Sequence, residues 1–259
     1  MNIDLAVTWT EAQHVDLTGR AVVVIDVLRA TSTIVAAFHS GARAVIPVDT
    51  VEAARAMASR LERGSAVLGG EREGLQIDGF ELGNSPLDYT PEAVAGKTVI
   101  LTTTNGTRAL LAARKADYVV AASLANVSAA AERLHNRDQD VTVICAGTEG
   151  RLSLDDLHCG GMLISRLLEP GVVRELSDGA RAATEWFVSN AGNAEHVLRS
   201  CFHGQRLAAL GFAQDIAFCS QIDTTAVVPV WNGHALVLDQ VPGAPGSAQE
   251  ATGEGADRV

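Results

Sequence analysis

The amino-acid sequence predicts an α/β protein with a mostly parallel sheet covered by helices on both faces. Strand-like and helix-like segments alternate along most of the chain. Several strand segments are continuous β-branched runs, which is typical of strands buried on both faces. Apolar residues make up 47% of the 259 residues and aromatic residues only 4%, so small aliphatic side chains fill the interior. Alternation of this kind implies parallel strands with helices packed on either side.

The first half of the chain supplies most of the predicted sheet. A β-branched run predicts the first strand, Gly41 ends the helix after it, and Thr50 caps the next helix. Pro91 is placed at the first position of a further helix. The expected strands lie at 21–27, 44–48, 65–68, 98–101 and 118–122, and the expected helices at 31–40, 50–63, 105–114 and 127–135. The strand at 65–68 is expected to end at the sequence GGERE, and Asn126 to cap the helix at 127–135.

The second half is predicted with fewer elements. Strands are expected at 141–146, 227–231 and 235–238, and helices up to about Leu168, at 180–190 and at 206–210. The pair Asn232-Gly233 between the last two strands indicates a hairpin. Residues 242–259 are rich in Gly, Ala, Pro and Glu and are expected to be a disordered tail, which leaves 1–241 as one α/β domain.

Charge and hydropathy limit the classes of partner. The formal net charge of −11 argues against nucleic acid, which calls for a basic surface, and against an anionic membrane. A small anionic ligand is still compatible with this net charge, because a few arginines or a metal ion at the site are enough to bind it. No signal peptide and no membrane-spanning run of roughly 18–20 apolar residues is expected, so the sequence predicts a soluble, cytoplasmic protein.

Three segments share one design that points to an anion. VVVIDVLRATST, VILTTTNGTRAL and VTVICAGTEGRLSLDD each run from an apolar strand through hydroxyls or glycines into a helix. Helix N-termini carry unpaired N–H groups and attract phosphate. These residue types are also ordinary helix caps, but three such starts at one sheet edge favour an anion site. The candidate phosphate-binding residues are Thr31, Ser32, Arg72, Thr103, Thr104, Asn105, Gly106 and Thr107.

Carboxylates form the second group of candidates. Asp26 ends a buried strand, where an unpaired charge is costly unless it is paired or binds a metal. Acids beside a phosphate site suggest Mg²⁺, which prefers oxygen ligands. The candidate metal ligands are Asp26, Glu71, Glu81 and Asp156. Asp155 and Asp156 also have a plain explanation, since acids favour the first turn of a helix. The histidines form no group. A position of His203 at the site stays open, although a surface or core position is preferred.

Several blocks of the chain, taken together, resemble the 2-phosphosulfolactate phosphatase family. The matching blocks are IDVLRATST (Ile25–Thr33), the glycine-rich Gly69–Gly74, FELGNSP (Phe80–Pro86), TTTNGT (Thr102–Thr107) and AGTEG with the later Asp155-Asp156 and Gly160-Gly161. They occur in the expected order, and the resemblance becomes weaker beyond about Leu163, with further matches near His203-Gly204 and Asp215. One departure is Asp155, where the family pattern has Glu.

The resemblance implies a Mg²⁺-dependent phosphomonoesterase that hydrolyses 2-phospho-3-sulfolactate to 3-sulfolactate and phosphate, a step toward coenzyme M. The fold it implies is a three-layer α/β/α unit. A division of this unit into two similar lobes, 1–122 and 123–241, is one possibility. Other small phosphorylated acids stay open as substrates. Arg29, Arg72 and Arg108 are consistent with a substrate of two negative charges.

The mechanism expected on this basis assigns catalytic roles to Asp26, Arg29 and Asp156. Asp26 is either a metal ligand, the preferred role, or a nucleophile that forms an aspartyl phosphate. Arg29 is expected to stabilise transition-state charge, so that Arg29→Ala lowers the rate by roughly 10²–10³-fold with little change in melting temperature.

Two rivals come from other classes of function. The same helix starts would serve a phosphometabolite sensor without turnover, although a binder of anions has no need of the carboxylates. They would also serve a phosphotransferase, although no nucleotide-binding loop is recognisable. The Ala- and Leu-rich helices would allow a homodimer without requiring one.

Overall fold

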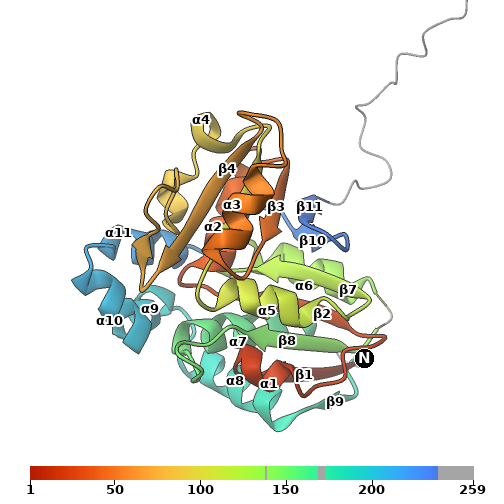
Figure 1. Cartoon of the computed structure of the whole chain (residues 1–259). Helices are drawn as coiled ribbons and strands as arrows, with labels where there is room; N and C mark the ends of the chain where they lie inside the picture. The colour runs from red at the N-terminus through yellow and green to blue at the C-terminus, as the bar shows by residue number, and fades with distance from the viewer. Residues whose placement is uncertain (138, 169–172, 239–259) are drawn as a thin grey trace, which may run out of the picture.

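The computed structural model describes residues 1–137, 139–168 and 173–238, which form one eleven-stranded sheet with helices on both sides (Figure 1). In order across the sheet the strands are β5 (Leu75–Gln76), β4 (Ala66–Arg72), β6 (Thr98–Thr102), β3 (Ala44–Pro47), β11 (Leu236–Leu238), β10 (Pro229–Trp231), β7 (Tyr118–Ala122), β2 (Ala21–Ile25), β8 (Val141–Cys145), β1 (Asn2–Ala6) and β9 (Glu175–Leu176). The predicted α/β class with a mostly parallel or mixed sheet is confirmed.

The sheet consists of two parallel units joined by a hairpin. Strands β4, β6 and β3 pair in parallel, as do β7, β2, β8, β1 and β9. The antiparallel hairpin β10–β11 lies between them and pairs antiparallel with β7 and β3. This is the hairpin predicted at Asn232-Gly233, and Gly233 has the positive φ that its turn requires. The second unit combines strands from both sides of residue 122, and the division into lobes at that residue stays a prediction.

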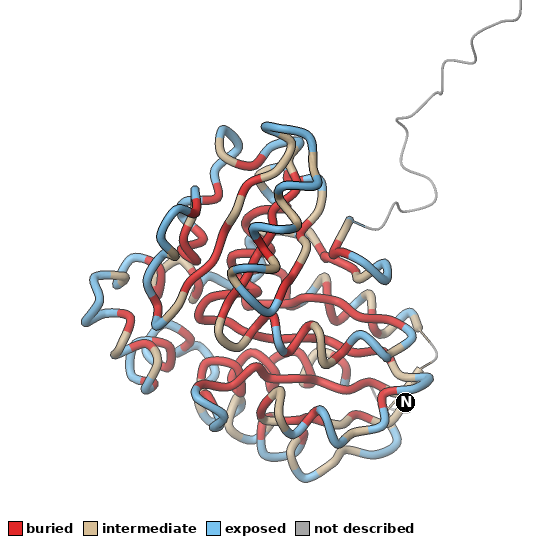
Figure 2. The backbone as a smooth tube through the Cα atoms, viewed as in Figure 1, coloured by how far each residue is buried: buried red, intermediate tan, exposed pale blue. Residues whose placement is uncertain are grey.

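Helices cover both faces because alternate residues of the central strands point to opposite sides. Val23 and Ile25 of β2 pack in the cluster that holds α6, α7 and α8, whereas Val22 and Val24 pack with α2 and α5. Figure 2 shows these central strands coloured as buried over most of their length. The helices are α1 (Trp9–Ala12), α2 (Ala30–His39), α3 (Val51–Ala58), α4 (Pro91–Val94), α5 (Gly106–Ala113), α6 (Val127–His135), α7 (Leu154–Leu167), α8 (Asp178–Ser189), α9 (Ala194–Ser200), α10 (Phe202–Ala209) and α11 (Ala213–Cys219), with 3₁₀ turns η1 (Pro86–Asp88) and η2 (Leu124–Asn126). In the described part of the chain, no helix is long and apolar enough to cross a membrane.

Strand β4 is longer than predicted, since it continues through the glycines at which it was expected to end. Gly69 faces the Tyr89 hydroxyl, and a Cβ at Gly69 would lie 2.1 Å from that oxygen. A Cβ at Gly70 would lie 2.2 Å from the Thr102 carbonyl oxygen, and Gly70 has a φ of 152°. Glycine therefore serves close packing inside a strand at this position, which a sequence pattern cannot distinguish from a turn.

Asn126 is the N-cap residue of α6, as predicted, but its side chain does not form the cap hydrogen bond. The side chain instead accepts from the Ser123 N–H and donates to the carbonyl oxygens of Ala121 and Val227. The elements β1, β9, α1, α9 and α11 were not predicted. They are two to seven residues long, too short to show a clear period in the sequence. The tail at 242–259 lies outside the described residues.

Acid is expected to destabilise this fold through His158. His158 is buried in α7 and packs edge-on against Phe187 of α8 at 5.3 Å between ring centroids. Within the part of the chain that the structure describes, neither of its ring nitrogens has a hydrogen-bond partner. Burial lowers the pKa of His158. The folded state therefore takes up the proton less readily than the unfolded state. The free energy of unfolding is unaffected above about pH 6.5 and falls below it, by up to about 1.4 kcal/mol per pH unit, until the folded pKa is reached.

Urea unfolding of His158→Leu and of the wild type between about pH 7 and 5 measures this effect. The variant is expected to lose less stability on acidification. His14→Leu, at an exposed position, is the control. An acid loss equal in all three proteins would rule out His158 as the cause.

Candidate active site

A cavity of about 330 Å³ lies at the carboxyl ends of four strands. Asp26 directly follows β2, Arg72 ends β4, Thr103 follows β6, and Thr148 lies shortly after β8. These four residues all line the cavity. The edge of the sheet where ligands are expected in α/β folds is thus the edge that carries the predicted anion-binding segments.

Asp26 is held at the start of α2. Its Oδ1 accepts from the Ala30 N–H at 3.1 Å, and its own N–H donates to the Thr31 hydroxyl at 2.9 Å. The side chain is 7% exposed and packs against Gly106, where a Cβ would lie 2.6 Å from Asp26 Oδ2. Burial, reinforced by the charges of Asp155 and Glu71, raises the pKa of Asp26 to about 7. A carboxyl group with this pKa is suited to hold either a proton or a cation near neutral pH.

Arg29 lines the cavity with its charge already compensated. Its Nη1 donates to Asp215 Oδ2 at 2.7 Å, its Nη2 donates to the Gly74 carbonyl at 2.7 Å, and the guanidinium lies over the Phe212 ring. Asp215 Oδ1 also accepts from the Ser85 hydroxyl at 2.8 Å. Arg29 therefore ties α2, the loop after β4 and α11 together, and the expectation that Arg29→Ala leaves the melting temperature unchanged is revised to a decrease.

Glu71 and Arg72 lie side by side at the end of β4 and have different surroundings. Both Glu71 oxygens accept backbone N–H groups, from Thr104 at 2.7 Å and from Gly74 at 2.8 Å. Arg72 donates to the Glu71 carbonyl at 2.7 Å and to the Thr102 hydroxyl at 3.0 Å. Among the described residues Arg72 forms no ion pair with a carboxylate. Its positive charge is therefore available to an anion in the cavity.

Asp156 does not line the cavity. Its Oδ1 accepts from the Val27 N–H at 2.8 Å and its Oδ2 from the Gly147 N–H at 2.9 Å. The side chain thus connects the loops that follow β2 and β8. Burial, with the charges of Asp155 and Asp26, raises the pKa of Asp156. The structure places Asp156 as a neighbour of Asp26 that supports the loops.

Six other predicted residues lie at the cavity or directly behind it. Thr103, Thr104 and Asn105 line the cavity. Thr31, Gly106 and Thr107 lie behind it, where Thr107 closes the turn at the start of α5 through hydrogen bonds with Thr103.

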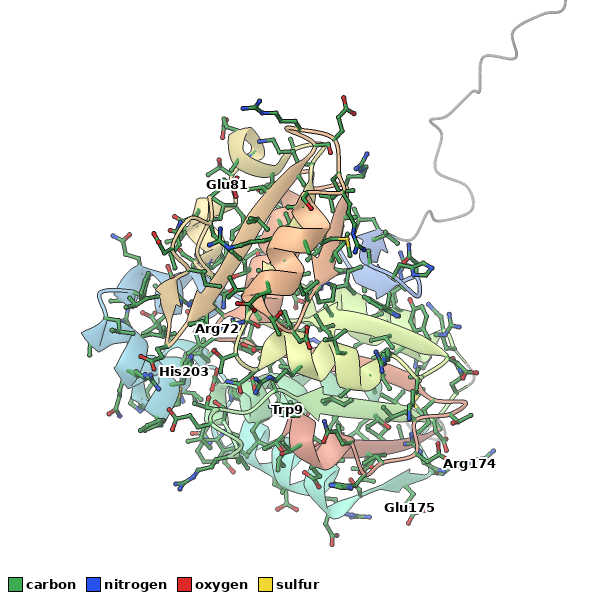
Figure 3. All side chains as sticks on the ribbon, viewed as in Figure 1. Trp9, Arg72, Glu81, Arg174, Glu175 and His203 are labelled. Atoms are coloured by element: carbon green, nitrogen blue, oxygen red, sulfur yellow. The ribbon has the colours of Figure 1, made fainter. Side chains whose placement is uncertain are left out.

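Three predicted residues lie elsewhere. Ser32 donates to the Val27 carbonyl and borders a different pocket. Arg108 lies over the Trp9 ring, 5.5 Å from its centroid, at another surface pocket. Glu81 accepts from the Leu68 N–H and does not line the cavity. Figure 3 shows Glu81 well separated from Arg72 and His203.

The structure adds residues that the sequence did not single out as site residues. Asn84, Thr148, Glu149, His203 and Arg206 all line the cavity. For His203 the structure shows the less preferred of the two positions left open by the sequence, the one at the site. His203 lies on the first turn of α10, more than 170 residues after Asp26 in the chain, so no local pattern indicates their proximity. The match of His203-Gly204 to the family pattern was the one sequence signal for this position.

Three buried polar atoms that belong to cavity-lining residues have no hydrogen-bond partner among the described residues: Asn84 Oδ1, Thr104 Oγ1 and His203 Nδ1. Unpaired buried polar atoms are costly and are rarely retained without a reason. Burial lowers the pKa of His203, which keeps its ring neutral near neutral pH. A polar ligand in the cavity would satisfy these atoms.

The four predicted metal ligands are not brought together. In the described parts of the chain, no group of three or more His, Cys, Asp or Glu side chains is arranged to hold a metal ion. Asp26 and Glu71 line the cavity, whereas Asp156 and Glu81 do not. Two carboxylates with a substrate oxygen and waters are nevertheless a common environment for Mg²⁺. The unpaired oxygens of Asn84 and Thr104 are of the same hard type, so the cavity fits this ion.

Glu81→Gln is expected to leave kcat and KM within about twofold of the wild type, because Glu81 does not reach the cavity and a glutamine oxygen can still accept from Leu68. Steady-state phosphate release measures this, with Glu71→Gln as the matched variant inside the cavity. A loss of more than tenfold in Glu81→Gln would restore Glu81 to the site.

Comparisons with known proteins identify the family of this chain. The family model described as 2-phosphosulpholactate phosphatase matches residues 7–234. A protein of Thermotoga petrophila, named "Probable 2-phosphosulfolactate phosphatase", is 43% identical over 86% of this chain and 94% of its own length. A protein of Clostridium beijerinckii with the same name is 38% identical over 92% of this chain and 100% of its own. The predicted family is confirmed. The chain belongs to the 2-phosphosulfolactate phosphatase family, a family of phosphoric monoester hydrolases.

Proposed function

We propose that this protein hydrolyses 2-phospho-3-sulfolactate, or a similar small phosphorylated acid, to 3-sulfolactate and phosphate, and that the reaction depends on Mg²⁺. The names of its relatives supply the substrate. The observation that carries the proposal is a cavity lined by Asp26, by Arg72 and by three polar atoms, in which, among the described residues, Arg72 has no carboxylate partner and the three atoms have no hydrogen-bond partner.

The phosphate is expected on the side of the cavity formed by the ends of β4 and β6. Arg72 supplies a positive charge there, and Asn105 lies at the N-terminal end of α5. Backbone N–H groups at a helix start favour phosphate oxygens. The Thr104 hydroxyl is free to donate a further hydrogen bond. These donors oppose the charge that spreads over the equatorial oxygens during phosphoryl transfer.

Asp26 and Glu71 would hold Mg²⁺ beside that phosphate, with Asn84 Oδ1 as a neutral oxygen nearby. When bound, the ion supplies a Lewis acid that neutralises phosphate charge and activates water. The backbone N–H groups of Thr104 and Gly74 fix both Glu71 oxygens, and the Ala30 N–H fixes one oxygen of Asp26. Neutral His203, with an unpaired Nδ1, is placed to exchange a proton with the ester or with water.

The test is phosphate release from a panel of small phosphorylated carboxylic and sulfonic acids with Mg²⁺, followed by EDTA and then excess Mg²⁺. We expect 2-phospho-3-sulfolactate or a close analogue to be hydrolysed, EDTA to abolish release, and Mg²⁺ to restore it. Tight binding of these compounds without turnover would replace the proposal with the sensor. Rapid-quench labelling decides the role of Asp26, because stoichiometric label on Asp26 would make it the nucleophile.

A further inference from the structure

We infer that Arg206 binds the second acid group of the substrate, a sulfonate or carboxylate, and that the Glu149 carboxylate occupies this position until the substrate arrives. The inference rests on the proposed function. In the structure Arg206 Nη1 lies 2.6 Å from Glu149 Oε1, and both residues line the cavity.

Three arginines line the cavity, and they differ in how their charge is balanced. Arg29 is paired with Asp215 in the interior, with both side chains at most 3% exposed, so a ligand cannot replace that carboxylate at low cost. Arg72 has no carboxylate partner among the described residues. Arg206 has one, but its side chain is 36% exposed and that of Glu149 is 59% exposed. Of the ion pairs that the cavity arginines form with described residues, the Arg206–Glu149 pair is the exchangeable one.

Arg72 and Arg206 come from different elements that line the cavity. Arg72 ends β4, in the unit formed by β4, β6 and β3. Arg206 lies on α10, with Glu149 and Thr148 in the loop after β8 of the other unit. A small molecule with a phosphate and a second acid group would engage one arginine through each. The volume of about 330 Å³ suits a substrate of this size.

The loop presents Glu149 in a fixed position. Thr148 and Arg151 exchange two backbone hydrogen bonds, at 2.9 and 3.0 Å, around Glu149 and Gly150. Both central residues have positive φ, 54° and 72°, as in the tight turns that suit Asn or Gly better than Glu. The turn thus holds the Glu149 carboxylate against Arg206 at the position that an acid group of the substrate would take.

The exchange is favourable on chemical grounds. An exposed ion pair contributes little to stability, because solvent screens it and two long side chains must be ordered. A sulfonate or carboxylate delivered by a bound substrate can form paired hydrogen bonds to a guanidinium, and its entropy is already reduced by the phosphate contacts. Release of Glu149 therefore costs less than the new contact provides. The result is selection for phosphorylated acids over simple phosphomonoesters.

The test compares Arg206→Gln and Glu149→Gln with the wild type on 2-phospho-3-sulfolactate and on phenyl phosphate, which has no second acid group. For Arg206→Gln we expect kcat/KM for 2-phospho-3-sulfolactate to fall roughly 10–100-fold, mainly because KM rises. The decrease in kcat/KM for phenyl phosphate should be several-fold smaller than that. For Glu149→Gln we expect a lower KM for the first substrate. Arg199→Gln is the control, since Arg199 forms an exposed ion pair with Glu195 on α9, outside the cavity.

Calorimetric binding of 3-sulfolactate separates this inference from the proposed function, because it requires no turnover. Weaker binding to Arg206→Gln and tighter binding to Glu149→Gln would support the inference even if no substrate were hydrolysed. The inference would be overturned if Arg206→Gln lost kcat/KM equally on both substrates, or if its affinity for 3-sulfolactate were unchanged. Neither result would contradict the proposed phosphatase function. Circular dichroism spectra check that each variant is folded.

Discussion

Asp26→Asn is expected to lower kcat by at least roughly 10²–10³-fold, the usual effect of removing a group that meets charge in the transition state. Asp26 lines the cavity beside Glu71 and the start of α5, and its carboxylate is needed whether it holds Mg²⁺ or acts as a nucleophile. The substitution keeps size and shape, and an amide oxygen can still accept from Ala30. Saturating phosphate-release assays measure the effect.

Asp26→Asn is expected to lose activity without losing stability. The pKa of Asp26 is raised from 3.8 to about 7, so the folded state holds the proton more tightly than the unfolded state. The contribution of this proton to the free energy of unfolding is full at low pH and is lost as pH rises from about 4 to about 7. Asparagine does not ionise and avoids this loss. In the absence of divalent ions, the melting temperature of Asp26→Asn at pH about 8 should therefore match or exceed that of the wild type.

Asp16→Asn, at an exposed site, is the control for a general effect of charge. Turnover of Asp26→Asn within threefold of the wild type would remove Asp26 from the chemistry. Lost turnover together with a sharply lower melting temperature would instead indicate a damaged fold.

The sequence predicts those parts of the fold that depend on neighbours along the chain. Strand β7 and helix α6 begin and end where the sequence predicts, because their apolar periods and boundary residues are local signals. The position of the β10–β11 hairpin between β3 and β7 depends on pairing with strands more than 100 residues away, Val230 with Val120 and Leu236 with Val45. No periodicity in one segment contains that information.

The residues of the candidate site also divide into those with a local sequence signal and those placed by tertiary packing. Asp26, Thr103 and Asn105 could be predicted because each lies at a strand-to-helix transition within one stretch of sequence. The sequence left His203 as a less preferred alternative and gave no signal for Arg206, since α10 is brought to the cavity by tertiary packing. Predicted residues such as Ser32 and Glu81 lie elsewhere because the register of a helix or the path of a loop decides where a side chain points, and residue type does not fix that register.

Asp215→Ala is expected to be among the most destabilising single substitutions in the chain. Asp215 is the carboxylate that balances buried Arg29, and it also accepts from Ser85 on the loop after β5. Removal of one partner leaves an uncompensated charge in the interior, which typically costs about 3–5 kcal/mol. Arg29 would shift within the cavity wall, so we also expect kcat/KM to fall roughly 10–100-fold. Urea unfolding and steady-state kinetics measure the two effects.

A double-mutant comparison identifies the cause of that loss. If the penalty comes from the unpaired guanidinium, then Arg29→Met combined with Asp215→Ala removes the buried charge, and the double variant should be more stable than Asp215→Ala alone. If the two losses instead add, Asp215 stabilises the fold through its other contacts, and the account of Arg29 as a charge held in place by α11 is wrong. Asp215→Asn, which can still accept from Ser85 but has no charge, should lie between the wild type and Asp215→Ala because it keeps the hydrogen bond and loses the ion pair.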